Sequence, residues 1–433
     1  MKKGKKAGNE RAREVIKRML VEFYDGGLPA FYKREVDSAP YIETKSAVVI
    51  TGPRMAGKTY MMYQFMKELA GGLRNCVYIN FEDNRLVDFT YLDFEEILNA
   101  YYELNPGKEP ILFLDEIHVV DYWHLFVRRL VDRGFKVFIT GSNSRLLSRE
   151  YATHIAGRHI EIALLPFSFR ELVSIKGLES GKDLPYSKKR FEIMQLLEEY
   201  LIFGGLPDVA LAKSKELKFK LLEGYLNTVV YKDLMARFKI SDGESFKTFI
   251  KKIVENIGNP FSIYNIEKKM DSMGYTTTRK TLQIYLKHLE EGFFAIPSEL
   301  FQRSLSKRET EKRMYIIDNG YLNLFLIKED KGKQMENLIA VEIFRRKGEL
   351  YYFRGEKEVD FASPIPIQSC FDVSDALTYE REVSALESYL AYSKKKMGII
   401  VTWDKFEKIE RNGKEIRFVP LYYFLLYPEE FVK

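Results

Sequence analysis

The sequence predicts an α/β protein with a parallel, doubly wound sheet near its N-terminus, and three observations support this fold class. Short apolar runs recur between residues 46 and 170, and helical segments separate them. A glycine-rich loop at 52–59 follows the first run directly, and the acidic pair Asp115 and Glu116 ends the third. Because strands that alternate with helices form parallel sheets, we expect a ligand site where these strands end.

The first predicted strand, 47–51, leads into the pattern Gly-x-x-x-x-Gly-Lys-Thr, and a helix at 60–69 follows. Glycines let the backbone N–H groups of such a loop turn toward phosphates, Lys58 can reach the β- and γ-phosphates, and the Thr59 hydroxyl can hold a metal ion. We therefore expect ATP and Mg²⁺ as ligands. The residues expected to contact the nucleotide are Gly52, Pro53, Arg54, Met55, Ala56, Gly57, Lys58, Thr59 and Tyr60.

The apolar run 111–114 is predicted to be a strand that carries Asp115 and Glu116 at its carboxyl end. A carboxylate there can hold magnesium, and an acidic neighbour can polarise the water that attacks the γ-phosphate. We assign Asp115 to the metal and Glu116 to the general base, with Lys58 as the catalytic cation. The alternative is that the acidic pair only begins a surface turn. His118 is expected to support the site or lie on the surface rather than catalyse.

Three more strands are predicted at 76–81, 135–140 and 159–165, with helices at 91–104 and 122–131. In P-loop ATPases with a catalytic glutamate, the fourth strand lies between the first and the third, so we expect the order 5-1-4-3-2. Ser142 or Asn143, just after the fourth strand, would then point at the nucleotide as a γ-phosphate sensor. An ordinary turn would explain the same residues.

Length and composition limit the other possibilities. With 433 residues, the chain is expected to form roughly two to four domains. It has no apolar run of about 18 residues, and its N-terminus predicts a charged amphipathic helix at 9–23, so we expect a soluble, cytoplasmic protein. Cys76 and Cys370 provide neither a disulfide framework nor the spacing of metal ligands. The net charge of +6 permits nucleic-acid binding without demonstrating it.

From Glu171 the sequence predicts helices to about residue 238, with a Gly-Gly-Leu-Pro turn at 204–207 that opens one of them. Helical lids of this kind pack over the nucleotide of AAA-type ATPases. Arg158, before the fifth strand, and Arg237, late in the lid, could each touch the γ-phosphate in cis or in trans. Either arginine could equally make an ordinary surface ion pair.

The segment 245–328 has the element order of a winged helix-turn-helix, with three helices and then two strands. The third helix begins with hydroxyl and basic side chains and is the expected recognition helix. The residues expected to face the DNA groove are Thr278, Arg279, Lys280 and Gln283. The basic segment 303–309 would form the wing. Double-stranded DNA is the expected partner, and a protein partner is the alternative, because winged helices serve both purposes.

The last part of the chain, 329–433, resembles a metal-dependent nuclease core, with the acidic residues Glu336 and Glu342 on a helix and Asp360 at the end of a hairpin, and we expect Glu342 and Asp360 to supply its carboxylates. Cys370 stands where such a core needs a lysine to stabilise the phosphate or poise the attacking water. We therefore expect a nuclease-like fold that is inactive, with Arg381 as the obvious substitute cation. Alternatively, Glu342 pairs with an arginine of its own helix and Asp360 only closes the hairpin.

Over nearly its whole length, the chain resembles prokaryotic AAA-type ATPases of the archaeal-ATPase and STAND-like branch. The motifs that carry this resemblance lie at 52–59, 112–116, 140–142, 156–158, 164–171, 205–207 and 358–361. The resemblance implies a helical lid, a winged helix and a C-terminal domain of restriction-endonuclease-like fold and unknown function. Cys370 departs from the nuclease pattern.

We expect five parts: a helical extension at 1–45, the ATPase core at 46–170, the lid at 171–244, the winged helix at 245–328 and the nuclease-like domain at 329–433. In a first hypothesis, ATP binding and hydrolysis switch the lid and a DNA-binding winged helix between states. In a second, ATP gates a metal-dependent DNA nuclease of a defence or mobile-element system. Cys370 favours the first, and a homo-oligomer or a protein partner is compatible with both.

Overall fold

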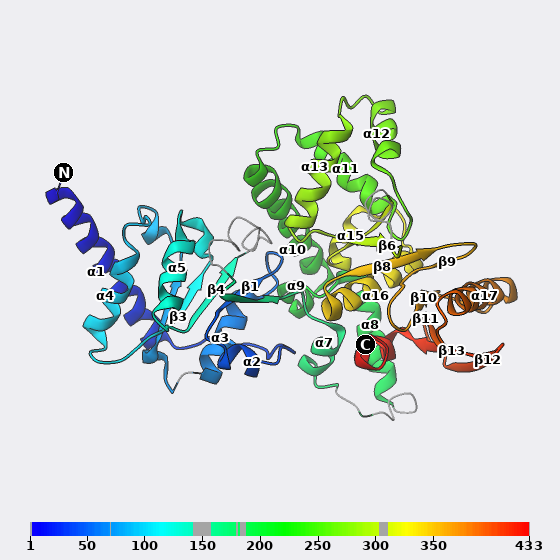
Figure 1. Cartoon of the computed structure of the whole chain (residues 1–433), viewed down its shortest axis with the longest axis horizontal. Helices are drawn as coiled ribbons and strands as arrows, with labels where there is room; N and C mark the ends of the chain where they lie inside the picture. The colour runs from blue at the N-terminus through cyan, green and yellow to red at the C-terminus, as the bar shows by residue number, and fades with distance from the viewer. Residues whose placement is uncertain are drawn as a thin grey trace. The chain divides into compact units, whose positions relative to one another are not determined.

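The computed structural model describes residues 2–69, 71–141, 157–178, 181, 188–302 and 311–432. The chain divides into two compact units, Met1–Leu164 and Leu165–Lys433, which run from blue to cyan and from green to red in Figure 1. Across the described residues, no helix is both long enough and apolar enough to cross a membrane.

The first unit is built around one sheet. Its helices are α1 (Lys2–Gly26), α2 (Ala39–Glu43), α3 (Lys58–Leu69), α4 (Phe94–Leu104) and α5 (Trp123–Asp132), with 3₁₀ turns η1 (Leu73–Asn75), η2 (Asn84–Leu86) and η3 (Ile117–Val119). Its strands are β1 (Ala47–Thr51), β2 (Cys76–Asn80), β3 (Ile111–Asp115), β4 (Val137–Gly141) and β5 (His159–Ala163). All five predicted strands are therefore present, each within a few residues of its predicted bounds.

The five strands are parallel and lie in the order β2-β3-β4-β1-β5, which confirms the predicted order 5-1-4-3-2. Successive residues of a strand face opposite sides of the sheet, so the side chains of each continuous apolar run pack into two cores, one on each face. Val49 faces the core shared with α4 and α5, and Val48 faces the core shared with α3. The carboxyl ends of β1, β3 and β4 consequently lie together at one edge.

Helix α1 packs against α4 and the edge strand β2. Ile16 and Leu20 are fully buried there, as the amphipathic pattern predicts. At the end of the helix, the Tyr24 hydroxyl donates a hydrogen bond to the Cys76 carbonyl at 3.0 Å. Since Cys76 is the first residue of β2, this contact fixes α1 to the exposed edge of the sheet.

The second unit begins with helices and continues with two four-stranded sheets. Its helices are α7 (Phe169–Ile175), α8 (Lys189–Phe203), α9 (Pro207–Leu211), α10 (Lys215–Asn227), the π-helical η6 (Thr228–Ala236), α11 (Gly243–Glu255), α12 (Ile263–Ser272), α13 (Arg279–Glu291), α15 (Asn319–Phe325), α16 (Lys331–Lys347), α17 (Ala376–Tyr392), α18 (Leu421–Leu426) and the 3₁₀ turn η7 (Pro428–Glu430). Its strands are β6 (Ala295–Leu300), β7 (Lys312–Ile316), β8 (Leu350–Arg354), β9 (Glu358–Val359), β10 (Ile367–Ser369), β11 (Met397–Thr402), β12 (Glu407–Arg411) and β13 (Lys414–Pro420).

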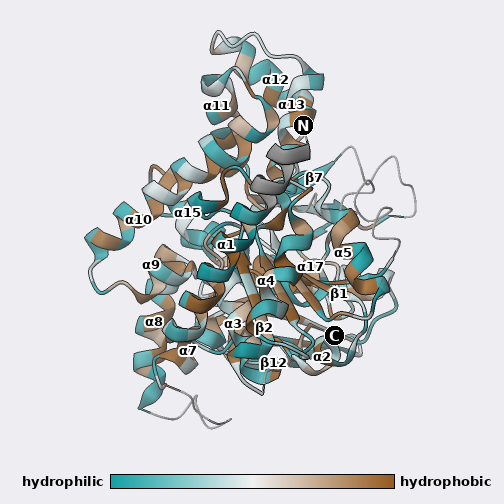
Figure 2. Ribbon diagram, turned by 90° about the vertical axis from the view of Figure 1, so that its left-hand side faces the viewer, coloured by the Kyte–Doolittle hydropathy of each residue, from teal (hydrophilic) through white to brown (hydrophobic). Residues whose placement is uncertain are grey.

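The two sheets have the orders β7-β6-β8-β9 and β10-β11-β13-β12. Helices α11, α12 and α13 precede the antiparallel pair β6 and β7, in the order predicted for 245–328, and the unpredicted helix α15 follows them. The segment predicted to form the wing, 303–309, lies outside the described residues. In Figure 2, hydrophilic and hydrophobic residues alternate along α12 and α13, as expected for helices with one buried face. Strand β8 pairs in parallel with β6, so this sheet continues across residue 328.

The Gly-Gly-Leu-Pro turn at the end of α8 is built around the buried carboxylate of Asp318. Its Oδ2 accepts the Gly205 N–H at 2.7 Å, and its Oδ1 accepts the Gly320 N–H at 2.8 Å. A Cβ on Gly205 would lie 2.2 Å from the Phe167 carbonyl oxygen, so the turn requires glycine there. Burial raises the pKa of Asp318 to about 6. Helix α9 starts at Pro207, as predicted.

Candidate functional site

The glycine-rich loop joins the end of β1 to the start of α3. Gly52 has a φ of 145°, and a Cβ there would lie 2.0 Å from the Leu164 carbonyl oxygen, so only glycine fits. Met55 and Gly57 also have positive φ values, of 63° and 92°. The loop then enters α3, a helix of 12 residues, whose first N–H groups have no partner within the helix. These groups and the helix dipole favour an anion at this end.

Lys58 is the buried cation of the loop. Its Nζ donates to the carbonyl oxygens of Gly52 at 3.3 Å and Pro53 at 3.1 Å, and it lies 3.8 Å from Glu116 Oε1. The residue is only 6% exposed. A phosphate would be a stronger partner for this ammonium than two neutral carbonyl groups.

The carboxylate of Asp115, at the end of β3, accepts hydrogen bonds from three hydroxyl groups. Thr59 Oγ1 donates to Oδ2 at 2.8 Å, and the Tyr78 hydroxyl donates to the same oxygen at 3.1 Å. The Thr140 hydroxyl donates to Oδ1. Burial raises the pKa of Asp115, and the hydrogen bond from Thr140 opposes that rise. The predicted metal residues, Thr59 and Asp115, are therefore in direct contact.

Glu116, the predicted base, has left-handed backbone angles, with φ 50° and ψ 36°. Such angles are uncommon for residues other than glycine and concentrate at functional sites. The Thr140 hydroxyl accepts the Glu116 N–H at 2.8 Å, so one hydroxyl group holds both acidic residues. Glu116 Oε1 faces Lys58, and Oε2 lies 3.2 Å from His118 Nδ1. His118 thus contacts the predicted base.

Comparison with known proteins agrees with this geometry. A family model described as an AAA domain matches residues 44–173, and one described as a domain of unknown function (DUF8612) matches residues 194–331. The uncharacterized protein MJ1544 of Methanocaldococcus jannaschii is 31% identical over 389 residues, which cover 86% of this chain and 87% of that protein. The chain belongs to the AAA-type P-loop ATPases. It shares a family with MJ1544.

Other similarities are more distant. An uncharacterized protein of Haemophilus influenzae is 27% identical over 395 residues, which cover 87% of this chain and 94% of that protein. The S. cerevisiae Hsp104-ADP complex is similar over 63% of this chain, with a TM-score of 0.33 and 19% sequence identity. The STAND protein PH0952 from Pyrococcus horikoshii is similar over 74% of this chain, with a TM-score of 0.28 and 12% sequence identity. The matches span 40% and 46% of those two chains.

Two other residues predicted to contact the nucleotide, Arg54 and Tyr60, are partly exposed. Arg54 Nη2 lies 3.4 Å from Glu82 Oε1, just after β2. The Tyr60 ring is about half exposed on α3, in edge contact with Tyr63. Ser142, the predicted sensor, lies outside the described residues, as does Asn143. Its role therefore stays a prediction.

The two arginines that could touch the γ-phosphate both make ion pairs. The Arg158 guanidinium pairs with the Asp132 carboxylate at the end of α5, and both side chains are nearly half exposed. In the second unit, Arg237 Nη2 lies 3.9 Å from Asp233 Oδ1, one helical turn away. Ordinary pairing was the alternative for each, and a role at the phosphate stays a prediction.

The contacts of two hydroxyl groups with Asp115 were not predicted. Tyr78 in β2 and Thr140 in β4 each place a hydroxyl on Asp115. Thr140, which belongs to the 140–142 motif, interrupts an apolar run close to the carboxyl end of its strand, and this signal could have identified the contact, whereas Tyr78 lies in the middle of β2. A buried hydroxyl needs a partner, and at this edge of a parallel sheet the neighbouring strand's acidic residue is the nearest one.

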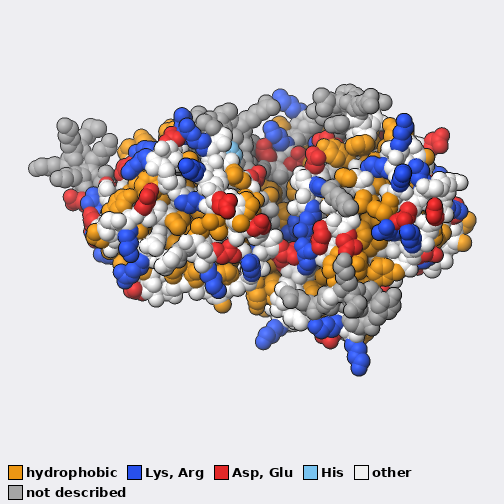
Figure 3. All heavy atoms as spheres, turned by 60° about the horizontal axis from the view of Figure 1, so that its bottom comes forward, with side chains coloured by type: hydrophobic (Ala, Val, Ile, Leu, Met, Phe, Trp, Pro, Cys, Tyr) orange, Lys and Arg blue, Asp and Glu red, His pale blue; other side chains and the backbone are white. Residues whose placement is uncertain are grey.

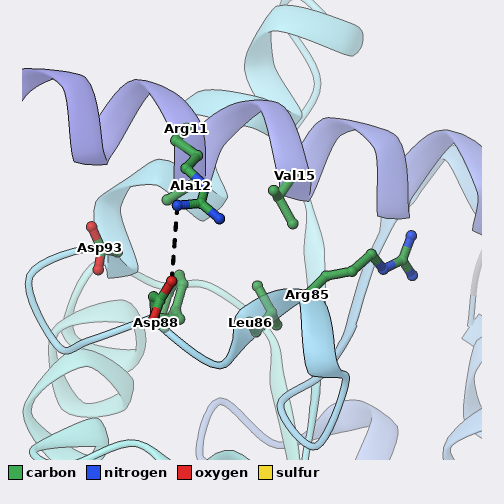
Figure 4. A pocket seen from close by; sticks show the side chains of 8 residues that line it. Arg11, Ala12, Val15, Arg85, Leu86, Asp88 and Asp93 are labelled. Carbon is green, nitrogen blue, oxygen red and sulfur yellow. Dashed lines mark ion pairs between the residues drawn. The ribbon is translucent and has the colours of Figure 1, made fainter.

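A separate hollow of about 140 Å³ lies between α1 and the segment after β2 (Figure 4). Arg11 and Asp88 pair across it at 3.9 Å, and both side chains are 79% exposed. Exposed pairs of this kind contribute little to stability. This hollow is lined from α1 and 85–93, not from the glycine-rich loop.

In the C-terminal part, the acidic residue that lies beside Asp360 is not the one that was predicted. Glu342 accepts hydrogen bonds from Arg345 Nε at 3.1 Å and Arg346 Nε at 2.9 Å, so its alternative pairing within α16 is confirmed. Its assignment beside Asp360 is wrong. Glu336 of the same helix lies there instead. Six residues of an α-helix turn through about 600°, which places Glu336 and Glu342 on different faces.

The cation beside Asp360 is Arg313 of β7, which no sequence pattern indicated. This guanidinium is 2% exposed and lies 3.1 Å from Asp360 Oδ1, 2.8 Å from Glu358 Oε2 and 3.9 Å from Glu336 Oε1. Burial, reinforced by the Asp360 carboxylate, raises the pKa of Glu336.

Cys370 and Arg381 lie near this acidic cluster but do not join it. The buried Cys370 thiol contacts the Asp372 carbonyl oxygen at 3.3 Å. Arg381, the expected substitute cation, pairs with Glu382 at 2.7 Å. Among the described side chains, no three acidic, histidine or cysteine residues converge as metal ligands.

Proposed function

We propose that this protein binds ATP together with Mg²⁺ and hydrolyses it. The observation that carries the proposal is the 2.8 Å contact between Thr59 Oγ1 and Asp115 Oδ2, beside the buried Lys58 ammonium and Glu116. Enzymes catalyse phosphoryl transfer mainly by positioning the reactants and by stabilising charge. The groups present here, a hydroxyl, two carboxylates and an ammonium, suit both tasks. They come together at the loop that the nucleotide phosphates would occupy.

The donor atoms fit a magnesium ion. Thr59 and Asp115 both offer oxygen, which Mg²⁺ prefers, and magnesium sites of this type take their other ligands from water and from substrate phosphates. The hydroxyl groups of Tyr78 and Thr140 orient the Asp115 carboxylate. Bound by these residues, the ion would neutralise negative charge on the β- and γ-phosphates.

The residues of the chain then have separate roles. Lys58 would exchange two backbone carbonyls for phosphate oxygens and counter the charge that develops during transfer. Glu116 would take a proton from the attacking water. Its left-handed backbone, held by the Thr140 hydroxyl, turns its carboxylate to within 3.8 Å of Lys58.

Two substitutions separate binding from hydrolysis. Glu116→Gln should keep ATP–Mg²⁺ binding by calorimetry and slow phosphate release by about 10²–10⁴-fold, because an amide cannot take the proton. Lys58→Ala should lose binding itself. Glu109→Gln, an exposed carboxylate before β3, is the matched control and should behave as wild type. Normal phosphate release by Glu116→Gln would remove Glu116 from the base role, and no release by wild type would refute hydrolysis.

We also propose that 245–328 is a winged helix that binds double-stranded DNA. The side chains assigned to the groove, those of Thr278, Arg279, Lys280 and Gln283, are exposed on or beside α13. Lys287, seven residues after Lys280 and thus on the same face, is exposed too. Exposed lysines on a helix face are the electrostatic feature that phosphate contacts need. On the face that Figure 3 shows, basic and acidic side chains are interspersed.

Arg279 supports this proposal through its fixed orientation. Its Nε lies 3.3 Å from Glu267 Oε2 of α12, and its guanidinium lies over the Tyr264 ring at 4.9 Å. These contacts hold the start of α13 against α12. A rigid helix start suits readout of DNA bases, because those residues enter the groove first.

In this proposal, ATP binding and hydrolysis shift the helices at 171–244 and the winged helix between states, so the protein is a nucleotide-dependent switch. The nuclease hypothesis has less support. A guanidinium, Arg313, neutralises Asp360 where a metal ion would be needed, and Glu342 is bonded to arginines of its own helix. We therefore propose that 329–433 has a structural or binding role.

A further inference from the structure

The segment that joins α1 to α2, residues 27–38, lies along helix α3. Lys33 Nζ lies 3.7 Å from Glu68 Oε1, near the end of this helix. One residue later, the Arg34 backbone N–H donates to Gln64 Oε1 at 2.8 Å. Gln64 is 2% exposed, so the segment is fixed to α3 by a buried hydrogen bond.

From this position the Arg34 side chain reaches the glycine-rich loop. Its Nη1 donates to the Ala56 carbonyl oxygen at 2.9 Å. Arg34 is 5% exposed and Ala56 is fully buried. A buried guanidinium is costly unless it is hydrogen-bonded, so this contact is a fixed part of the fold rather than a surface encounter.

The contact determines how one peptide group of the loop is oriented. In a planar trans peptide, the C=O of one residue and the N–H of the next point in opposite directions. Arg34 holds the Ala56 C=O on the side of the 27–38 segment, so the Gly57 N–H points to the other side. Backbone N–H groups of such loops cradle the phosphates. A cation on the carbonyl oxygen also polarises the peptide, which strengthens its N–H as a donor.

We propose that Arg34 is a positioning residue for the nucleotide phosphates: it fixes the peptide between Ala56 and Gly57 so that the Gly57 N–H is directed at them. The proposal rests on the ATP binding proposed above. It gives the N-terminal segment a function at the site, although that segment lies outside the match to the AAA domain, which begins at residue 44. The ligand class is a diphosphate or triphosphate group.

The test compares ligand affinity with fold stability in the full-length protein. Arg34→Met keeps the length of the side chain and removes its donors, and Arg34→Gln keeps one neutral donor. Lys33→Ala is the control, because Lys33 is exposed and its contact is with Glu68, not with the loop. Calorimetry with ADP–Mg²⁺ and with pyrophosphate measures the phosphate site, and thermal unfolding without ligand measures stability.

We expect Arg34→Met to weaken ADP and pyrophosphate binding by about tenfold or more, Arg34→Gln to weaken both less, and Lys33→Ala to weaken neither. If wild type does not bind ADP, the proposed function itself is wrong. If wild type binds and either folded Arg34 variant binds with wild-type affinity, the positioning role is wrong. Failure of both variants to fold would assign Arg34 a purely structural role and overturn the proposal as well.

Discussion

Thr140→Val should destabilise the first unit and disrupt the two carboxylates that are proposed to act in hydrolysis, those of Asp115 and Glu116. The Thr140 hydroxyl donates to Asp115 Oδ1 and accepts the Glu116 N–H at 2.8 Å. Valine has nearly the same shape but offers neither interaction. Since Thr140 is fully buried, no solvent can replace the lost partners without a rearrangement.

The magnitude follows from these two hydrogen bonds. An unpaired buried N–H costs about 1–3 kcal/mol, and a lost hydrogen bond to a charged group costs about 1.5–3 kcal/mol. The extra apolar group of valine offsets roughly 1 kcal/mol. The net loss in unfolding free energy is about 1.5–5 kcal/mol. For a unit of this size, such a loss lowers the melting temperature by roughly 3–20 °C.

The two tryptophans of the chain make the assay specific to one unit. Trp123 is buried in α5 of the first unit, and Trp403 lies in the second. In a Trp403→Phe background, fluorescence therefore reports the first unit alone. Thr140→Ser, which keeps the hydroxyl, is the matched control and should lose no more than about 1 kcal/mol. Equal losses for valine and serine would show that the hydroxyl is not what holds Asp115 and Glu116, and would refute the reasoning.

Two further predictions concern the second unit. The double variant Lys280→Glu, Lys287→Glu should bind duplex DNA more weakly, and the slope of log K against log salt concentration should become shallower by about one to two units. The control, Lys394→Glu with Lys396→Glu, makes an equal change of charge elsewhere and should change neither quantity. Unchanged binding at matched salt would point to a protein partner instead. Wild-type protein should leave supercoiled DNA intact with Mg²⁺ or Mn²⁺, because Arg313 already neutralises Asp360. Nicking that disappears in Asp360→Ala would contradict this.

The parts of the candidate site that could be predicted from the sequence are those determined by residues close together in the chain. The loop at 52–59 needs glycine at Gly52 because a carbonyl oxygen lies against it, and it needs Lys58 and Thr59 at fixed spacing from that glycine. The positions of Asp115 and Glu116 could be predicted because both residues lie at the carboxyl end of one apolar strand. The sheet order was predicted from the arrangement known for P-loop ATPases with a catalytic glutamate, and the observed order β2-β3-β4-β1-β5 agrees with it.

The contacts that the sequence did not predict join residues far apart in the chain. Arg34 and Ala56 are 22 positions apart, and Arg313 and Asp360 are 47 apart. A single arginine in a sequence carries no sign of its partner, because most arginines are solvated. The assignment of Glu342 failed for a related reason. Two acidic residues shared one helix, and only packing decides which face is turned toward Asp360.

Lys58, Thr59 and Asp115 already have protein partners, so nucleotide binding must exchange contacts rather than satisfy unpaired groups. Lys58 would give up two neutral carbonyls, and Thr59 and Asp115 would give up their mutual contact in order to hold a metal ion. The hydroxyl groups of Tyr78 and Thr140 belong to strands and can keep their bonds to Asp115 during this exchange. The carboxylate therefore stays oriented while its partner on α3 changes. Preorganisation of this kind lowers the cost of assembling the catalytic site.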